Sequence, residues 1–233
     1  MTDELAARLA DIDARIALAA RASRRDPAEI TRIVVTKFHP ASLVEHLAAL
    51  GVTDVGENRQ QELSAKVDEL REIAALRWHF IGQAQTNKAR AVRQAASVVH
   101  SVDRARLADA FERAGLDGAG PLTPLEVLIQ VNLTDDPGRG GAAPDEIERL
   151  AEHIIGGCGT LRLRGLMAVA PLDEDPAPAF ARLHEYAARL RTVAPDATWI
   201  SAGMTGDFAE AIAAGATHLR IGSAITGPRP QHG

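Results

Sequence analysis

The chain has 233 residues, of which 46% are hydrophobic and 24% charged, with a formal net charge of −5. This apolar fraction excludes a disordered chain, and the mild negative charge argues against a nucleic-acid-binding protein. The single cysteine, Cys158, excludes a secreted domain held by intrachain disulfides. The N-terminus is acidic where a signal peptide would be basic, and no apolar run reaches the ~20 residues of a membrane span. These features predict a cytoplasmic protein that does not bind a membrane.

The start of the chain has the spacing of an amphipathic helix. Leu5, Leu9 and Ile12 recur every three or four residues among charged residues, which predicts a helix over about residues 2–24. Short apolar runs then alternate with longer segments of helical spacing. This pattern predicts eight strands, at residues 33–35, 53–55, 78–81, 97–100, 125–131, 163–169, 198–200 and 217–221. Among the intervening helices, one is predicted to begin at Pro144, one to cover 180–190 and one to begin near Asp207.

Strands that alternate with helices predict βαβ units and a parallel sheet. Eight such units that close on themselves form a (β/α)₈ TIM barrel, for which ~200–250 residues is the usual length. We therefore predict a single domain over residues 1–233, with the barrel at about 30–228. A doubly wound open sheet is the alternative, because hydrophobic periodicity does not distinguish a closed sheet from an open one.

Lys37 follows the first predicted barrel strand by two residues. Active sites in TIM barrels lie at the carboxyl ends of the strands, so a polar residue there is a candidate. A solvated loop lysine is the ordinary alternative. A lysine held out of water more readily loses its proton, and the neutral amine can form a Schiff base with an aldehyde.

The loops after the last two strands have the composition of a phosphate site. Ser201, Gly203 and Thr205 follow one strand, and Gly222 and Ser223 follow the other. Phosphate sites in TIM barrels form at these two loops, where glycines let backbone N–H groups approach the ligand. Tight turns alone would explain the glycines but not the hydroxyl groups beside them.

The remaining polar residues give weaker signals. Arg220, at the end of the last strand, is either a surface ion-pair partner or a permanent donor to a ligand. His79 and His100 lie within predicted strands and are expected to be structural. Lys66 and Lys88 are expected to be solvated. The spacing of histidine and cysteine matches no metal motif, so no metal site is predicted.

Several stretches resemble the pyridoxal phosphate homeostasis proteins, single-domain relatives of the alanine racemase barrel. These stretches are Val34-Val35-Thr36-Lys37, Val55-Gly56-Glu57-Asn58-Arg59-Gln60-Gln61-Glu62, Trp78-His79-Phe80-Ile81-Gly82, Gln85-Thr86-Asn87-Lys88, Leu163-Arg164-Gly165-Leu166-Met167 and Arg220-Ile221-Gly222-Ser223-Ala224-Ile225. They are long and occur in the family's order, from about residue 30 to the end of the chain.

The resemblance implies a role for each candidate residue. Lys37 would hold pyridoxal 5′-phosphate as an internal aldimine, Arg220 would face the pyridine nitrogen, and Asn58 would lie at the cofactor's edge. The residues implied around the phosphate are Ser201, Gly203, Thr205, Gly222 and Ser223. The chain departs from the family at Arg139, where the loop after the fifth strand usually has a lysine, so a role for that lysine in handing on the cofactor is in doubt.

The implied function is to buffer pyridoxal phosphate or deliver it to apo-enzymes that depend on it. A racemase needs a second base, and the only tyrosine, Tyr186, lies inside a predicted helix. Arg220 would stay protonated and weaken the cofactor as an electron sink. Two alternatives remain: a slow amino-acid racemase, and a phosphate-binding barrel enzyme without an aldimine.

Overall fold

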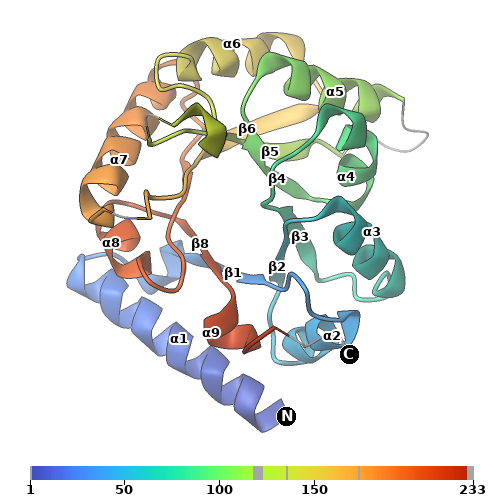
Figure 1. Ribbon diagram of the computed structural model, residues 1–233, viewed down its shortest axis with the longest axis vertical. Coiled ribbons are helices and arrows are strands. Elements are labelled where there is room, and N and C mark those ends of the chain that lie inside the picture. Colours follow the sequence, from blue (N-terminus) through green and yellow to red (C-terminus); the bar gives the residue numbers. More distant parts are fainter. Residues whose placement is uncertain (1, 118–122, 135, 173, 230–233) are drawn as a thin grey trace.

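The computed structural model describes residues 2–117, 123–134, 136–172 and 174–229. Eight parallel strands form a closed barrel in chain order (Figure 1). They are β1 (Thr31–Val35), β2 (Asp54–Glu57), β3 (Arg77–Phe80), β4 (Val98–Val102), β5 (Leu125–Gln130), β6 (Leu161–Met167), β7 (Trp199–Ser201) and β8 (His218–Ile221). The barrel closes where β1 pairs with β8, with Thr31 opposite His218 and Val34 opposite Ile221. This closure confirms the predicted TIM barrel and excludes the open sheet.

Helices surround the strands (Figure 1). They are α1 (Thr2–Ala22), α2 (Ala41–Ala49), α3 (Gln60–Glu69), α4 (Ala89–Ala95), α5 (Ala105–Leu116), α6 (Ile147–Gly157), α7 (Pro176–Val193), α8 (Phe208–Ala213) and α9 (Ser223–Thr226). The predicted N-terminal helix is α1, which lies outside the ring and contacts α8 and α9. Its buried face includes Leu5, Leu9 and Ile12, as the spacing predicts.

The predicted helix start at Pro144 is wrong by three residues. The backbone N–H of Glu146 donates to the carbonyl of Ala143 at 2.9 Å, which closes a turn around Pro144. The helix begins only at Ile147. Proline suits the start of a helix and the corner of a turn equally well, so its presence alone does not separate the two.

Most of the apolar core lies between the strands and the helices, where Val34, Leu63 and Phe180 are fully buried or nearly so. The interior of the barrel has a smaller apolar cluster, formed by Val98, Leu128 and Met167. Polar side chains share this interior, and their contacts are described below. In the described residues, the longest helices are too polar to cross a bilayer.

Candidate functional site

A cavity of about 350 Å³ opens at the carboxyl end of the barrel. Most of its wall comes from the end of β1 and the loop after it, the loop between β7 and α8, and the segment from the end of β8 past α9, and Ile81 after β3 completes it. Its lining residues are Val35, Lys37, Phe38, His39, Ile81, Met204, Thr205, Gly206, Arg220, Gly222, Ser223, Thr226, Gly227 and Arg229. This volume is in the range of small-molecule sites.

Five predicted site residues come together in this cavity: Lys37, Thr205, Arg220, Gly222 and Ser223. They come from three segments, at or just after the carboxyl ends of β1, β7 and β8, that lie far apart in the chain. The carboxyl ends of parallel barrel strands meet at one face, which is why the sequence argument could place these residues together.

Ser201 and Gly203 do not line the cavity. Ser201 ends β7 with its side chain fully buried beneath the cavity floor, where its Oγ contacts Arg220 and His100. Gly203 has φ +92°, and a Cβ at this position would lie 2.7 Å from the Cβ of Ala211. The structure therefore accounts for Gly203 by the tight packing of the loop against α8.

Asn58 also lies apart from the cavity, in a separate depression that it shares with Arg59, Gln83 and Lys88. Its Oδ1 is buried and has no hydrogen-bond partner among the described residues. The structure thus does not bring Asn58 into the cavity that holds Lys37. Arg139, in the loop after β5, is exposed.

The loop that carries Lys37 has an unusual backbone. Phe38 has φ +69°, a left-handed conformation that costs a residue with a side chain roughly 1–2 kcal/mol. Its N–H donates to Oε2 of Glu62 at 2.9 Å, and the N–H of His39 donates to the carbonyl of Thr36 at 3.1 Å. These bonds hold the turn that directs Lys37 toward the cavity.

A buried ion pair supports this loop from below. Lys66 Nζ pairs with Oε1 of Glu57 and donates to the carbonyl of Thr36 at 2.8 Å. The hydroxyl of Thr36 donates to the same Glu57 oxygen at 2.6 Å. Burial raises the pKa of Glu57, although the hydrogen bonds and charge of Lys66 oppose that rise.

The prediction that Lys66 is solvated is wrong. The spacing of α3 leaves a lysine on its inner face, and only the tertiary structure reveals that the buried Glu57 receives it. The pair fixes the backbone of Thr36, the residue before Lys37.

Arg220 presents a fixed positive charge at the bottom of the cavity. Its Nη1 donates to Oγ of Ser201 at 2.7 Å and its Nη2 to the carbonyl of Ala168 at 2.8 Å. Burial lowers the pKa of Arg220 to about 10, partly opposed by Asp207, so the guanidinium stays charged at neutral pH. The sequence left open whether this arginine points outward. In the structure its side chain is buried and points into the barrel.

The cavity wall is cationic. Lys37, Arg220 and Arg229 line it, and no Asp or Glu is among the described lining residues. A Cβ at Gly222 would meet only Val35, at 3.7 Å or beyond, so the packing leaves open space at this position. Gly222 lines the cavity together with Thr205 and Ser223, whose side chains carry hydroxyl groups. This cavity suits a small anion that carries a group able to react with an amine.

Sequence reasoning missed two polar residues of the cavity, His39 and Arg229. His39 stands two positions after Lys37, so the same strand-end argument could have found it. Burial, together with the charge of Lys66, lowers the pKa of His39. The guanidinium of Arg229 lies 4.4 Å from the centre of the Phe38 ring, a contact set by the return of the chain after α9 that no local pattern indicates.

A second cluster lies outside the cavity, between α5 and the end of α6. The ligating atoms of Asp109, His153 and Cys158 lie within 4.8 Å of one another, although the sequence spacing predicts no metal site. His153 Nε2 hydrogen-bonds Oδ1 of Asp109 at 2.7 Å, which accounts for both side chains. Burial and the neighbouring Glu112 and Asp109 raise the pKa of Cys158 to about 11, so its thiol stays protonated.

Comparison with known proteins places this barrel in a family. A family model described as "Alanine racemase, N-terminal domain" matches residues 8–230. A protein of Mycobacterium bovis named pyridoxal phosphate homeostasis protein is 39% identical, over 97% of this chain and 93% of its own. The chain belongs to the pyridoxal phosphate homeostasis protein family.

Solved structures agree with this membership. PipY of Synechococcus elongatus, described as a COG0325 family member with pyridoxal phosphate (PLP) bound, is 32% identical with a TM-score of 0.83, over 96% of this chain and 100% of its own. Alanine racemase of Corynebacterium glutamicum is only 14% identical, with a TM-score of 0.67, and this chain covers 63% of it. That second likeness shows the barrel fold alone.

Proposed function

We propose that this chain binds pyridoxal 5′-phosphate in the cavity at the carboxyl end of the barrel. We further propose that it acts in PLP homeostasis in the cytoplasm by buffering the cofactor or delivering it to apo-enzymes. The observation that carries the proposal is one cavity of about 350 Å³ that combines the Lys37 amine, the fixed Arg220 guanidinium and the wall at Thr205, Gly222 and Ser223. The PLP named in the description of the PipY structure supports it.

Each residue has a definite task in this proposal. Lys37 supplies the amine for covalent attachment, and Thr205, Gly222 and Ser223 receive the phosphate through hydroxyl and backbone donors. Bound pyridoxal phosphate supplies an aldehyde and an aromatic ring that can withdraw electrons. Arg220 faces the ring nitrogen as a donor. Because an arginine holds its proton, this donor disfavours protonation of the nitrogen and weakens electron withdrawal.

A carrier fits this cavity better than an efficient enzyme does. A racemase needs two groups that exchange a proton on opposite faces of the substrate. Tyr186 lies on α7, where its ring packs against the outer core and beneath Arg189, 5.6 Å from the ring centre. It is not among the described residues that line the cavity.

One observation favours a slow racemase as the second candidate, and that observation is His39. It lines the cavity near Lys37, and its lowered pKa leaves the imidazole neutral and able to accept a proton. Incubation with L-alanine in D₂O tests this activity, because a racemase exchanges the Cα proton. Rapid exchange that is lost in both Lys37→Ala and His39→Gln would contradict the proposal of a carrier and support a racemase.

The binding proposal is tested by covalent trapping. The purified chain is loaded with pyridoxal phosphate, reduced with borohydride and digested, and the modified peptide is identified by mass spectrometry. We expect a visible absorption band and a single adduct at Lys37, both lost in Lys37→Ala and retained in the control Lys88→Ala. No band, or an adduct spread over several lysines, would contradict the proposal and favour a phosphate-binding barrel enzyme.

The delivery step needs its own measurement. An apo-enzyme is mixed with the loaded chain, and its activation is followed beside the release of cofactor to a scavenger in solution. Delivery predicts activation faster than free release. Activation at the rate of release would leave buffering as the function.

A further inference from the structure

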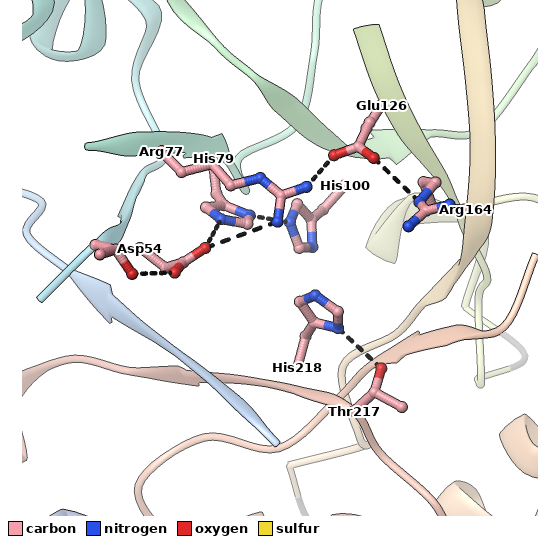
Figure 2. Close-up of polar contacts among 9 residues, drawn as sticks. Asp54, Arg77, His79, His100, Glu126, Arg164, Thr217 and His218 are labelled. Carbon is pink, nitrogen blue, oxygen red and sulfur yellow. Dashed lines mark hydrogen bonds and ion pairs between the residues drawn. The ribbon is translucent and has the colours of Figure 1, made fainter. Parts of the chain in front are cut away.

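A continuous chain of hydrogen bonds crosses the interior of the barrel. It begins at Asp54, the first residue of β2, whose Oδ1 lies 2.9 Å from His79 Nε2. His79 Nδ1 lies 2.9 Å from His100 Nε2, and His100 Nδ1 lies 2.9 Å from Oγ of Ser201. The last member is Arg220, which donates to the same Oγ at 2.7 Å. Figure 2 shows the first part of the chain, with the His79 ring between Asp54 and His100.

The two ends of this chain determine its direction. The carboxylate of Asp54 only accepts hydrogen bonds, and the guanidinium of Arg220 only donates them. Burial opposes ionisation of Asp54, but the hydrogen bonds from His79 and Thr53 and the nearby charge of Arg77 together lower its pKa. Each neutral imidazole between the two ends has one donor and one acceptor nitrogen.

With neutral rings, one arrangement satisfies every contact. His79 donates from Nε2 to Asp54 and accepts at Nδ1 from His100 Nε2. His100 then accepts at Nδ1 from the Ser201 hydroxyl, whose oxygen accepts from Arg220. Burial lowers the pKa of His79 despite Asp54, and it lowers that of His100 further, with repulsion from His79 and Arg220 adding to the effect. Both rings are therefore neutral at pH 7.

We propose that His79, His100 and Ser201 are positioning residues that hold the Arg220 guanidinium for its ligand. The Ser201 hydroxyl hydrogen is directed to His100, which leaves its oxygen lone pair for Arg220. The carbonyl of Ala168 holds the other terminal nitrogen, so the guanidinium is fixed at two points. The effect on a ligand rests on the proposed binding of pyridoxal phosphate. The arrangement of the hydrogen-bonded chain does not depend on that binding.

The burial of the hydrogen-bonded side chains supports this role. His79, His100 and Ser201 are all fully buried. They share the barrel interior with the apolar side chains of Val98 and Leu128. Buried polar groups cost free energy unless they are paired, so apolar residues would fill the same space at lower cost. The polar chain instead extends the fixed geometry of Arg220 down to Asp54 at the other end of the barrel.

The barrel also offers a matched control, His218. This histidine is buried in the same interior, but its Nδ1 lies 2.8 Å from Oγ1 of the adjacent Thr217, and its ring lies at a 36° tilt to the Trp199 ring with 4.2 Å between the ring centres. It is not a member of the chain from Asp54 to Arg220. A substitution at His218 therefore disturbs the interior without cutting that chain.

The first test is made on the ligand-free protein. Long-range ¹H–¹⁵N NMR spectra identify the protonated nitrogen of each histidine. We expect His79 and His100 to be neutral at pH 7, each with its proton on Nε2. A proton on Nδ1 of either ring, or a charged ring, would overturn the chain regardless of what the protein binds.

The second test measures the dissociation constant and absorption spectrum of pyridoxal phosphate in variants. Ser201→Ala and His100→Leu are expected to weaken binding about tenfold and to shift the absorption band. His100→Gln, whose amide can both donate and accept, should restore much of the affinity, and His218→Gln should bind like the wild type. Ser201→Ala removes a single oxygen, so it remains a test if His100→Leu does not fold.

The outcomes separate this proposal from the proposed function. If Ser201→Ala and His100→Leu bind like the wild type, or if His218→Gln weakens binding as much as they do, the positioning role is wrong. If the wild type itself does not bind pyridoxal phosphate, the proposed function fails, and the NMR result still decides the hydrogen-bonded chain.

Discussion

Arginines lie at both ends of the barrel, but those that line the cavity form no ion pair with a described acidic residue. At the carboxyl mouth, Lys37, Arg220 and Arg229 line a cavity without an acidic residue among the described lining. At the amino mouth, Arg77 pairs with Glu126 and lies 4.0 Å from Asp54, and Arg164 lies 3.1 Å from Glu126 (Figure 2). The positive charges of one mouth are balanced by protein, whereas those of the other are available to a ligand.

This difference shows that a residue type does not indicate a role without its partners. Arg77 and Arg164 also lie over the face of Trp199, 5.0 and 4.3 Å from the ring centre, so several contacts hold them at the amino mouth. Arg220 is held instead by two neutral acceptors, and no described carboxylate forms an ion pair with it. The arginine contacts at the amino mouth should therefore contribute mainly to stability and the charges of the cavity to binding, and four predictions test this separation.

The largest effect is expected at Lys66, whose buried ion pair supports the loop that carries Lys37. Lys66→Met leaves the buried carboxylate of Glu57 without its partner and should lower the free energy of unfolding by about 3–5 kcal/mol. Denaturant unfolding measures this change. Lys88→Met, which removes a lysine outside any described ion pair, is the control. A double variant with Glu57→Gln should recover part of the loss, and equal instability of the double variant would show that the pair is not the cause.

Acid should destabilise the fold through the barrel interior. Burial, with repulsion from His79 and Arg77, lowers the pKa of His218 from 6.5 to about 3. The unfolded chain therefore binds a proton below pH 6.5 that the folded chain does not, so stability is complete above this pH and decreases as the pH falls. Between pH 7 and pH 5 this group alone should cost about 2 kcal/mol. Unfolding at both values should show a smaller loss in His218→Gln, and an unchanged loss would contradict the assignment.

A substitution at the amino mouth should change stability and leave binding intact. Arg77→Met removes the contacts of Arg77 with Asp54 and Glu126 and should cost about 1 kcal/mol, because the pairs are partly exposed. The dissociation constant of pyridoxal phosphate should match that of the wild type. A change in affinity larger than the change in stability would break the separation of the two mouths.

The smallest effect on stability is expected at the carboxyl mouth. Arg229→Met removes a positive charge from the cavity and a contact with the Phe38 ring, which should cost less than about 1 kcal/mol. The affinity for pyridoxal phosphate should nevertheless decrease severalfold, because Arg229 lines the cavity proposed for this anion. Equal affinity would show that Arg229 lies outside the binding surface.

Much of the site could be predicted because it depends on the positions of strand ends. Lys37, Arg220 and Ser223 each lie near the carboxyl end of a strand or just beyond it, and closure of the barrel brings them to one face. Ser201 also follows this rule, but its side chain points into the barrel. A shift of one or two positions along a strand end decides between the cavity and the interior, and periodicity does not give that precision.

The sequence by itself determined the alternation of strands and helices, the N-terminal helix and the loops that carry Lys37 and the glycines. These features depend on local spacing and on turn chemistry, which neighbouring residues set. Only the tertiary structure decided that the sheet closes, that Lys66 meets Glu57, and that His79 and His100 link Asp54 to Ser201 and Arg220. These contacts join residues as far apart as Asp54 and Arg220, and their geometry comes from the packing of the whole barrel.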